Sequence, residues 1–300
     1  MNHPNLVCFG EILWDVLPTG KIAGGAPMNV AYHANNMGLT TTMISRAGDD
    51  ESGRELIGFL NGKGLDTGYI QTDPVQQTGI VQVTLNEKGS ATYEIVQPVA
   101  WDYINITEEA VSLVSQADAF VFGSLACRNT ESKNTLLKLI ESAKLKVFDV
   151  NLRTPFYDVE LVEELLLKAD VLKLNDEELE IIAAWIGIEG DELEQAEFVR
   201  TKYRIDTLIL TKGRKGAVCL TEEGYHSHPG FSIKVKDTIG AGDAFLAAFM
   251  VKTLNGFSVS DSLEFACGMG ALAATKAGGM PEITQNEIQN FIPHSAVYHG

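Results

Sequence analysis

Short apolar runs rich in β-branched residues alternate with helical stretches along most of the 300-residue chain. This alternation is typical of βα units around a mainly parallel sheet, because parallel strands are joined by crossover connections that are usually helical. The pattern therefore predicts an α/β fold. The strands expected in its sheet are Leu6–Phe9, Thr42–Ser45, Ala119–Phe122, Lys146–Val150, Val171–Leu174 and Thr207–Leu210.

Residues that are typical of helix ends mark the boundaries of two expected helices. Pro27 at a first helical position and Gly38 after the last turn bracket one helix. Ser258, with Asp261 three residues later, begins another that we expect to close at Gly278. No linker long enough to separate two independent domains interrupts the pattern, so residues 1–300 are expected to form one domain.

One segment departs from the βα alternation. Ile80–Leu85 and Ala91–Val96 each alternate sides at period two, and five residues join them, which predicts an antiparallel hairpin. The Gly- and Pro-punctuated stretch Ile12–Ala23 could supply partner strands. We therefore expect a small β lid, inserted as approximately residues 12–23 and 76–100.

Composition excludes several classes of protein. The 23 basic and 40 acidic residues give a net charge of −17, which disfavours nucleic acid as a partner. No apolar run approaches the roughly 18 residues of a membrane-spanning helix, so no membrane partner is expected. The N-terminus lacks a basic region before its short apolar run, which argues against an export signal. The cysteines, which form no Cys-x-x-Cys motif, are expected to be reduced core thiols in a cytoplasmic protein: Cys8, Cys127, Cys219 and Cys267.

The most informative motif is a glycine-rich turn that leads from a short expected strand at residues 234–236 into an apolar helix. Gly240 and Gly242 let successive backbone N–H groups converge on an anion at the positive end of that helix. Asp243 falls in the first helical turn, where a carboxylate could accept a proton from a hydroxyl. Alternatively, Asp243 only complements the helix dipole. A dinucleotide fingerprint fits poorly because Phe245 stands where a small residue is needed, and no Walker sequence is present.

Two further clusters carry polar groups suited to ligands. Gly24 and Gly25 precede a Pro-started helix in which Asn29 offers both a donor and an acceptor, as sugar hydroxyls require. A plain capping Asn after a flexible loop is the alternative. Asp149–Arg153 follows an expected strand, where open α/β sheets place ligands. Arg153 could bind a phosphate bidentately there, or it could be an ordinary surface arginine.

Two more clusters also follow strands. Lys173–Glu178 places carboxylates at a helix start, which suits either helix capping or Mg²⁺ held through water. Thr211–Gly216 is a basic, glycine-containing turn that suits either phosphates or a solvated hairpin. Because polar or glycine-rich clusters recur at strand ends and helix starts, the sequence predicts a ligand site there.

Together these segments resemble the ribokinase-like (PfkB) family of sugar kinases, and within it most of all the bacterial fructokinases. The two specific motifs are Gly24-Gly25-Ala26-Pro27-Met28-Asn29-Val30-Ala31 and Asp237-Thr238-Ile239-Gly240-Ala241-Gly242-Asp243-Ala244-Phe245. Supporting matches are Phe9-Gly10-Glu11 with Asp15, Asn175-x-x-Glu178, and Thr211-Lys212-Gly213 with Gly216. The resemblance implies a doubly wound α/β domain with a small β lid, and transfer of the γ-phosphoryl group of ATP to a sugar hydroxyl.

The resemblance also implies a role for each matching residue. Asp243 would be the catalytic base, with Gly240, Ala241 and Gly242 forming an anion hole and Arg153 near the transferred phosphoryl group. The sugar would contact Asp15, Gly24, Gly25 and Asn29. The nucleotide would contact Asn175, Thr211, Lys212, Gly213, Gly216, Cys267 and Gly270. Glu178 would position Mg²⁺, largely through water. Asp237, Ile239 and Gly279 match the place where many relatives bind a monovalent cation, which here would be K⁺.

The substrate and the assembly are further expectations. Ala26 stands where ribokinases usually have Lys, which favours fructose over ribose. Met28 and Val99–Asp102 depart from the usual pattern, so the alternatives remain a ribokinase, a 2-keto-3-deoxygluconate kinase, a nucleoside kinase or a catalytically silent sugar-binding relative. Apolar side chains on both faces of the hairpin predict a homodimer through the lid. Asp243 at a positive helix end is expected to be a weak base, which suffices for a loose transition state.

Overall fold

The computed structural model describes residues 4–17, 20–85 and 91–292. Within these residues the main sheet has nine strands, and all neighbouring strands are parallel except the antiparallel pairs β11–β12 and β12–β13. In spatial order the strands are β13 (Gly224–His228), β12 (Ala217–Thr221), β11 (Thr207–Thr211), β10 (Val171–Asn175), β9 (Lys146–Asp149), β8 (Ala119–Gly123), β1 (Asn5–Phe9), β4 (Thr40–Gly48) and β5 (Ile70–Asp73). The six strands expected in the main sheet are confirmed, as is the α/β class.

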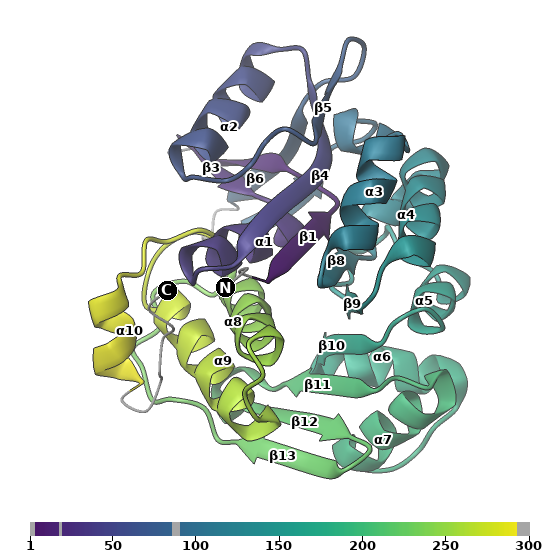
Figure 1. The fold of residues 1–300 in the computed structure, drawn as a ribbon, viewed down its shortest axis with the longest axis vertical. Coiled ribbons are helices and arrows are strands. Elements are labelled where there is room, and N and C mark those ends of the chain that lie inside the picture. The colour runs from purple at the N-terminus through teal and green to yellow at the C-terminus, as the bar shows by residue number, and fades with distance from the viewer. Residues whose placement is uncertain (1–3, 18–19, 86–90, 293–300) are drawn as a thin grey trace.

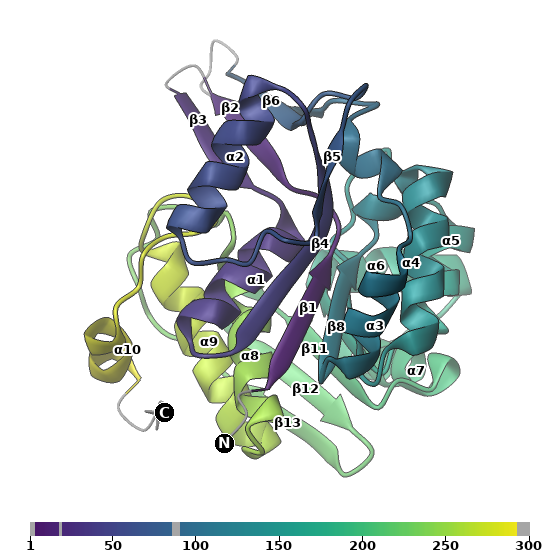
Figure 2. The ribbon, with the colours of Figure 1, turned by 45° about the horizontal axis from the view of Figure 1, so that its top comes forward.

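Helices cover both faces of this sheet, as Figures 1 and 2 show. The core on one face includes residues of α1 (Ala26–Asn36), α2 (Glu51–Gly62), α8 (Ala241–Leu254), α9 (Val259–Ala274) and α10 (Gln285–Phe291). The core on the other face includes residues of α3 (Glu108–Gln116), α4 (Thr130–Ser142), α5 (Val159–Leu166), α6 (Asp176–Ile186) and α7 (Glu192–Tyr203). The sheet is therefore doubly wound, with two separate apolar layers.

The alternation of side chains along each strand decides which layer a residue joins. In β9, Val147 belongs to the core that contains α8, whereas Phe148 belongs to the core that contains α4 and α5. The next residue, Asp149, is on the α8 side again. In β10, Val171 lies on the α8 side, so Lys173 does too. Two charged residues at the carboxyl ends of neighbouring strands thus face the start of α8.

A second sheet has four strands within the described residues, in the order β3 (Gly20–Gly24), β2 (Leu13–Leu17), β6 (Gly79–Leu85) and β7 (Ala91–Ile95). The antiparallel pairing of β6 with β7 confirms the expected hairpin, whose connection at 86–90 lies outside the described residues. The expected partner strands are also confirmed, since β2 pairs with both β3 and β6. Trp14 Nε1 donates to Ser52 O at 3.0 Å, and Lys21 pairs with Glu55, so α2 supports this small sheet (Figure 2).

The predicted helix starts are confirmed, but one helix end is wrong. Pro27 lies in the first turn of α1, and Ser258 caps α9 by accepting the Asp261 N–H at 3.1 Å. Helix α9 ends at Ala274 and not at Gly278. The physical reason is that residues 275–279 form the turn that carries Gly278 and Gly279 back toward α1.

The short strand expected at residues 234–236 is also wrong. This segment is irregular and Val235 is 55% exposed, and no strand pairs with it among the described residues. Lys236 N–H instead donates to the carbonyl of Ala274 at the end of α9, at 2.8 Å. The segment therefore reaches the glycine-rich turn as a loop along α9.

The remaining short elements are the 3₁₀ helices η1 (Ala100–Tyr103), η2 (Leu125–Arg128) and η3 (Gly213–Lys215). All four cysteines are buried and free, as the sequence predicted. No helix among the described residues has both the length and the apolar character needed to cross a membrane.

Candidate active site

The two glycine-rich motifs meet at the starts of α1 and α8. Gly25 (φ 123°) precedes α1 and Gly240 (φ 74°) precedes α8, both in backbone conformations that favour glycine. Asn29 Nδ2 donates to Asp243 Oδ2 at 2.7 Å, and both side chains are buried. The structure therefore joins the predicted sugar residue and the predicted base, which lie 214 positions apart.

Glycines also allow the turn at 278–279 to close against this pair. A Cβ at Gly279 would lie 2.6 Å from Asn29 Nδ2, and a Cβ at Gly240 would lie 2.6 Å from Gly279 O. His33 Nε2 lies 3.0 Å from the same carbonyl and donates to it, because a carbonyl oxygen can only accept. Burial lowers the pKa of His33 to about 4, so this imidazole is neutral near pH 7.

The predicted monovalent-cation residues lie in the same place. Asp237 accepts the N–H of Ile239 on Oδ1 at 3.0 Å and the N–H of Gly278 on Oδ2 at 2.9 Å. Gly279 follows directly. The structure thus brings together all three residues of the expected site, with both carboxylate oxygens of Asp237 already bonded to backbone amides. Among the described residues there is no cluster of three or more acidic, His or Cys side chains that could hold a metal ion.

The pKa of Asp243 corrects the expectation of a weak base. Burial, followed by the nearby negative charge of Asp149, raises this pKa to about 6. The positive charges of Lys173 and Arg153 and the hydrogen bond from Asn29 oppose the rise but do not cancel it. Asp243 is therefore a stronger base than an ordinary aspartate and remains mostly ionised at pH 7.

Lys173 and Asp149, which the sequence placed in two separate candidate clusters without a role for either, form a buried ion pair beside Asp243. Lys173 Nζ lies 2.8 Å and 3.0 Å from the two carboxylate oxygens of Asp149, and the side chains are 9% and 6% exposed. A Cβ at Gly242 would lie 3.3 Å from Lys173 Nζ. The available signal was a charged residue inside the otherwise apolar strand Val171–Leu174.

Glu178, predicted to position Mg²⁺, joins two loops at this edge of the sheet. Its Oε1 accepts the N–H of Leu152 at 3.0 Å, and its Oε2 accepts the N–H of Asn175 at 2.9 Å. Asn175 in turn caps α6 by accepting the Glu178 N–H at 2.8 Å. The carboxylate is buried, and burial is the largest cause of its raised pKa. Because both carboxylate oxygens already accept backbone N–H groups, Glu178 is better suited to contact a metal ion through water than to bind it directly.

The predicted sugar residues on the small sheet include a half-buried acid. Asp15 lies against Gly24, where a Cβ would come within 2.5 Å of its Oδ2, and burial raises the pKa of Asp15 to about 6. Glu11, which the sequence analysis matched but did not assign, accepts the Ala26 N–H on Oε1 at 3.3 Å. Its Oε2 has no partner, and burial raises its pKa to about 7. Buried acceptors without partners suit a ligand rich in hydroxyl groups.

Arg153 is the exposed cation of this site. Its Nη1 donates only to the carbonyl of Leu152, at 3.1 Å, and its charge lowers the pKa values of Glu11, Asp15 and Asp243. The guanidinium therefore lies near the acids without a carboxylate partner among the described residues, which leaves it able to bind an anion.

The predicted nucleotide residues lie along the next strands and α9. Asn175 and Thr211 are paired across β10 and β11, and the turn with Lys212, Gly213 and Gly216 follows. Gly270 packs against the start of α8, where a Cβ would lie 3.0 Å from Ala241 O. Cys267 is the weakest of the set, because it is only 7% exposed and offers little surface to a ligand.

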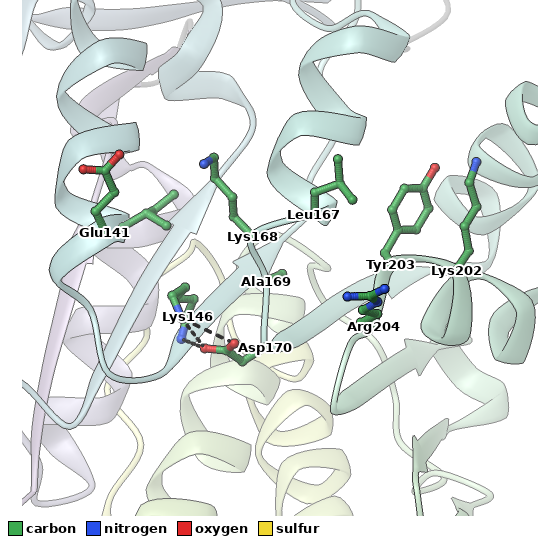
Figure 3. Close-up of a pocket in the computed structure, with 10 residues that line it drawn as sticks. Glu141, Lys146, Leu167, Lys168, Ala169, Asp170, Lys202, Tyr203 and Arg204 are labelled. Carbon is green, nitrogen blue, oxygen red and sulfur yellow. Dashed lines mark hydrogen bonds and ion pairs between the residues drawn. The ribbon is translucent and has the colours of Figure 1, made fainter.

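A cavity of about 570 Å³ lies away from all of these residues, at the amino edge of β9 and β10 (Figure 3). It is lined by Ile140, Glu141, Lys146, Leu167, Lys168, Ala169, Asp170, Lys202, Tyr203 and Arg204. Helices α4, α5 and α7 end there, and cations near helix carboxyl ends are favourable without any ligand. The candidate active site is therefore the carboxyl edge and not this cavity.

Comparisons with known proteins show the family of the chain. The model of the pfkB family of carbohydrate kinases matches residues 5–286. The chain is 29% identical to a fructokinase of Solanum tuberosum over 308 residues, covering 94% of this chain and 93% of that protein. It resembles an uncharacterized sugar kinase from Pyrococcus horikoshii at 28% identity and a TM-score of 0.82, covering 96% of this chain and 97% of the other. A fructokinase double mutant from Vibrio cholerae, in a form with bound fructose, ADP and potassium, is 25% identical with a TM-score of 0.84, covering 97% and 99%.

Proposed function

The chain belongs to the pfkB family of carbohydrate kinases and is a sugar phosphotransferase; we propose that its sugar is fructose and its phosphoryl donor ATP. The observation that carries the proposal is the Asn29–Asp243 hydrogen bond of 2.7 Å, which joins a group suited to sugar hydroxyls to a group suited to accept a proton. The similar proteins support fructose, since they include the fructokinase of Solanum tuberosum and the fructose- and ADP-bound form from Vibrio cholerae.

The side chains around this pair suit a neutral sugar. Asp15, Glu11 and Asn29 offer oxygen acceptors and one amide to hydroxyl groups. A sugar phosphate or a sugar acid would bring a second anion close to buried carboxylates, which is costly without a matching cation. The segment Gly24–Ala31 contains no Lys or Arg that could supply one.

In the proposed reaction Asp243 accepts the proton of the attacking sugar hydroxyl. The hydroxyl oxygen forms a bond to the γ-phosphorus as the bond from that phosphorus to the β–γ bridging oxygen breaks, and ADP leaves with the electron pair. A loose transition state places negative charge on the transferred group. Backbone N–H groups of Gly240, Ala241 and Gly242 and the guanidinium of Arg153 stabilise that charge.

The remaining site residues are proposed to hold the donor and its ions. Asn175, Thr211, Lys212, Gly213, Gly216, Cys267 and Gly270 lie along the nucleotide. Glu178 holds Mg²⁺ through water, and this ion supplies charge neutralisation to the phosphates when bound. Asp237, Ile239 and Gly279 hold K⁺ beside the anion hole.

The small sheet is proposed to act as the lid of the site and as the contact of a homodimer in the cytoplasm. Ile22 of β3 supports the first role, because it is 40% exposed and its side chain would come within 3.3 Å of a Cβ at Gly278. The positions of β3 and β7 at the two ends of this sheet, within the part of the chain that the structure describes, support the second role, since edge strands favour association.

A coupled assay with ATP and a panel of neutral, phosphorylated and acidic sugars tests the proposal. We expect kcat/KM for fructose to exceed that for ribose, fructose 6-phosphate and 2-keto-3-deoxygluconate at least tenfold. An assay without sugar controls for ATP hydrolysis. If ribose or an anionic sugar is preferred, that sugar and not fructose is the substrate. If no sugar is phosphorylated, the chain is a catalytically silent member of the family.

A further inference from the structure

Strands β9 and β10 place a buried ion pair, and with it the positive charge of Lys173, next to the glycine-rich turn at 240–242. Lys173 of β10 and Asp149 of β9 are register partners, so their side chains emerge on the same face of the sheet. That face carries α8, and Lys173 Nζ would lie 3.3 Å from a Cβ at Gly242. Gly242 does not have the positive φ of Gly240. Its missing side chain therefore makes room for Lys173 and does not relieve backbone strain.

Stability does not explain why this pair is buried. Removing two charges from water costs free energy, and well-packed apolar residues in place of a buried ion pair are often as stable or more stable. Both neighbours of Lys173 in β10, Leu172 and Leu174, are fully buried apolar residues. An apolar residue at position 173 would fit the same strand without the cost of burying a charge, so the lysine requires a functional explanation.

We propose that Lys173, held in place by Asp149, is a positioning residue that fixes one positive charge beside Asp243 and the turn at 240–242. The proposal rests on the proposed role of Asp243 as the base. Lys173 acts through Asp243 by electrostatics: its charge keeps the carboxylate ionised and ready to accept the hydroxyl proton. Asp149 holds the ammonium group in place and limits its effect.

The charged groups that act on Asp243 come from four segments. They are Asp149 from β9, Lys173 from β10, Arg153 from the loop after β9, and Glu11 from the segment after β1. Asp149 raises the pKa of Asp243, whereas Lys173 and Arg153 lower it. The two partners of one ion pair therefore act on the pKa of the base in opposite directions.

The test is the pH dependence of fructose kcat/KM for three proteins: the parent, Asp149→Asn, and Asp149→Asn with Lys173→Met. Asp149→Asn removes a negative charge and keeps an oxygen for Lys173, so the acidic midpoint should move to lower pH. Adding Lys173→Met removes the positive charge without leaving an unpaired Asp149, so the midpoint should move back up by about one pH unit or more. Midpoints of the three proteins that agree to within about 0.2 pH units, far less than the shift expected for a close charge, would overturn the proposal.

Thermal melting checks that each variant folds. If Asp149→Asn does not fold, Lys173→Met alone decides, because it removes the positive charge beside Asp243 and should raise the midpoint. An unchanged midpoint in this variant would overturn the proposal. Asp243→Asn separates this inference from the proposed function: full activity there would reject Asp243 as the base, whereas an inactive Asp243→Asn with unshifted midpoints elsewhere rejects only the role of Lys173.

Discussion

Two Lys–Asp pairs lie at opposite ends of β9 and β10, one at each edge of the sheet. At the amino edge Lys146 Nζ lies 3.1 Å from Asp170 Oδ2, and the side chains are 26% and 28% exposed (Figure 3). At the carboxyl edge Lys173 Nζ lies 2.8 Å from Asp149 Oδ1, and the side chains are 9% and 6% exposed. The same two residue types at opposite ends of the same two strands thus occupy different environments.

The difference shows that burial and neighbouring groups, and not residue type, decide whether a charged pair can affect catalysis. The half-exposed pair is screened by water and contributes roughly 0–1 kcal/mol. Helices α4, α5 and α7 end at the amino edge, so cations there are already stabilised by the helix carboxyl ends. The buried pair is poorly screened and lies where α1, α6 and α8 begin, close to Asp243. Only the second pair can alter the chemistry of a base.

The largest expected effect is the loss of activity in Asp243→Asn. This change removes the proton acceptor but keeps the oxygen that accepts from Asn29, so binding of ATP and fructose should persist. The kcat should fall by about 10²–10⁴-fold. Asp170→Asn is the matched control at the amino edge and should retain kcat within about twofold, as expected for a weak, half-exposed pair. A kcat of Asp243→Asn within threefold of the parent, a loss far below that of a general base, would remove Asp243 from the mechanism.

The same substitution should stabilise the protein at neutral pH. Asp243 has a folded-state pKa of about 6 against an ordinary value of 3.8, so its ionisation in the folded state costs stability as the pH rises through that window. Above pH 6 the penalty is on the order of 1–3 kcal/mol, and Asp243→Asn removes it. Denaturant unfolding should therefore show a more stable variant at pH 7.5 and little difference at pH 3.5. Equal or lower stability at pH 7.5 would show that burial is not costly at this position.

A smaller effect is expected at the sugar end of the site. Asp15→Ala removes a half-buried acceptor for a hydroxyl group, and leaving a hydroxyl of the bound sugar unpaired costs about 1–3 kcal/mol. The KM for fructose should rise about tenfold or more, and the KM for ATP should stay close to that of the parent. Steady-state kinetics with each substrate varied in turn measures both values. A fructose KM equal to that of the parent would place the sugar elsewhere.

Much of the fold could be predicted because its signals are local. The apolar runs of β8, β10 and β11 are short, rich in β-branched or aromatic residues and flanked by helical stretches, and they all form strands of the main sheet. Asn29 and Asp243 could be singled out because each follows glycines at a helix start. Their hydrogen bond, however, depends on α1 and α8 packing together.

The parts that escaped prediction depend on contacts between distant segments. Lys173 and Asp149 meet only because β9 and β10 align in register, which neither sequence segment reveals alone. The residues at 234–236 alternate like a strand but find no partner, and α9 ends early so that Gly279 can approach Asn29. The raised pKa of Asp243 likewise follows from burial, which outweighs the helix end considered at the sequence level.

The comparison between the two edges is tested most directly by matched pairs of substitutions. Fructose kcat/KM is measured against pH for Asp149→Asn with and without Lys173→Met, and for Asp170→Asn with and without Lys146→Met. The account predicts that Lys173→Met raises the acidic midpoint by about one pH unit or more, as loss of a close charge should, and that Lys146→Met leaves it unchanged. Equal shifts at the two edges, or a shift at the amino edge alone, would contradict it.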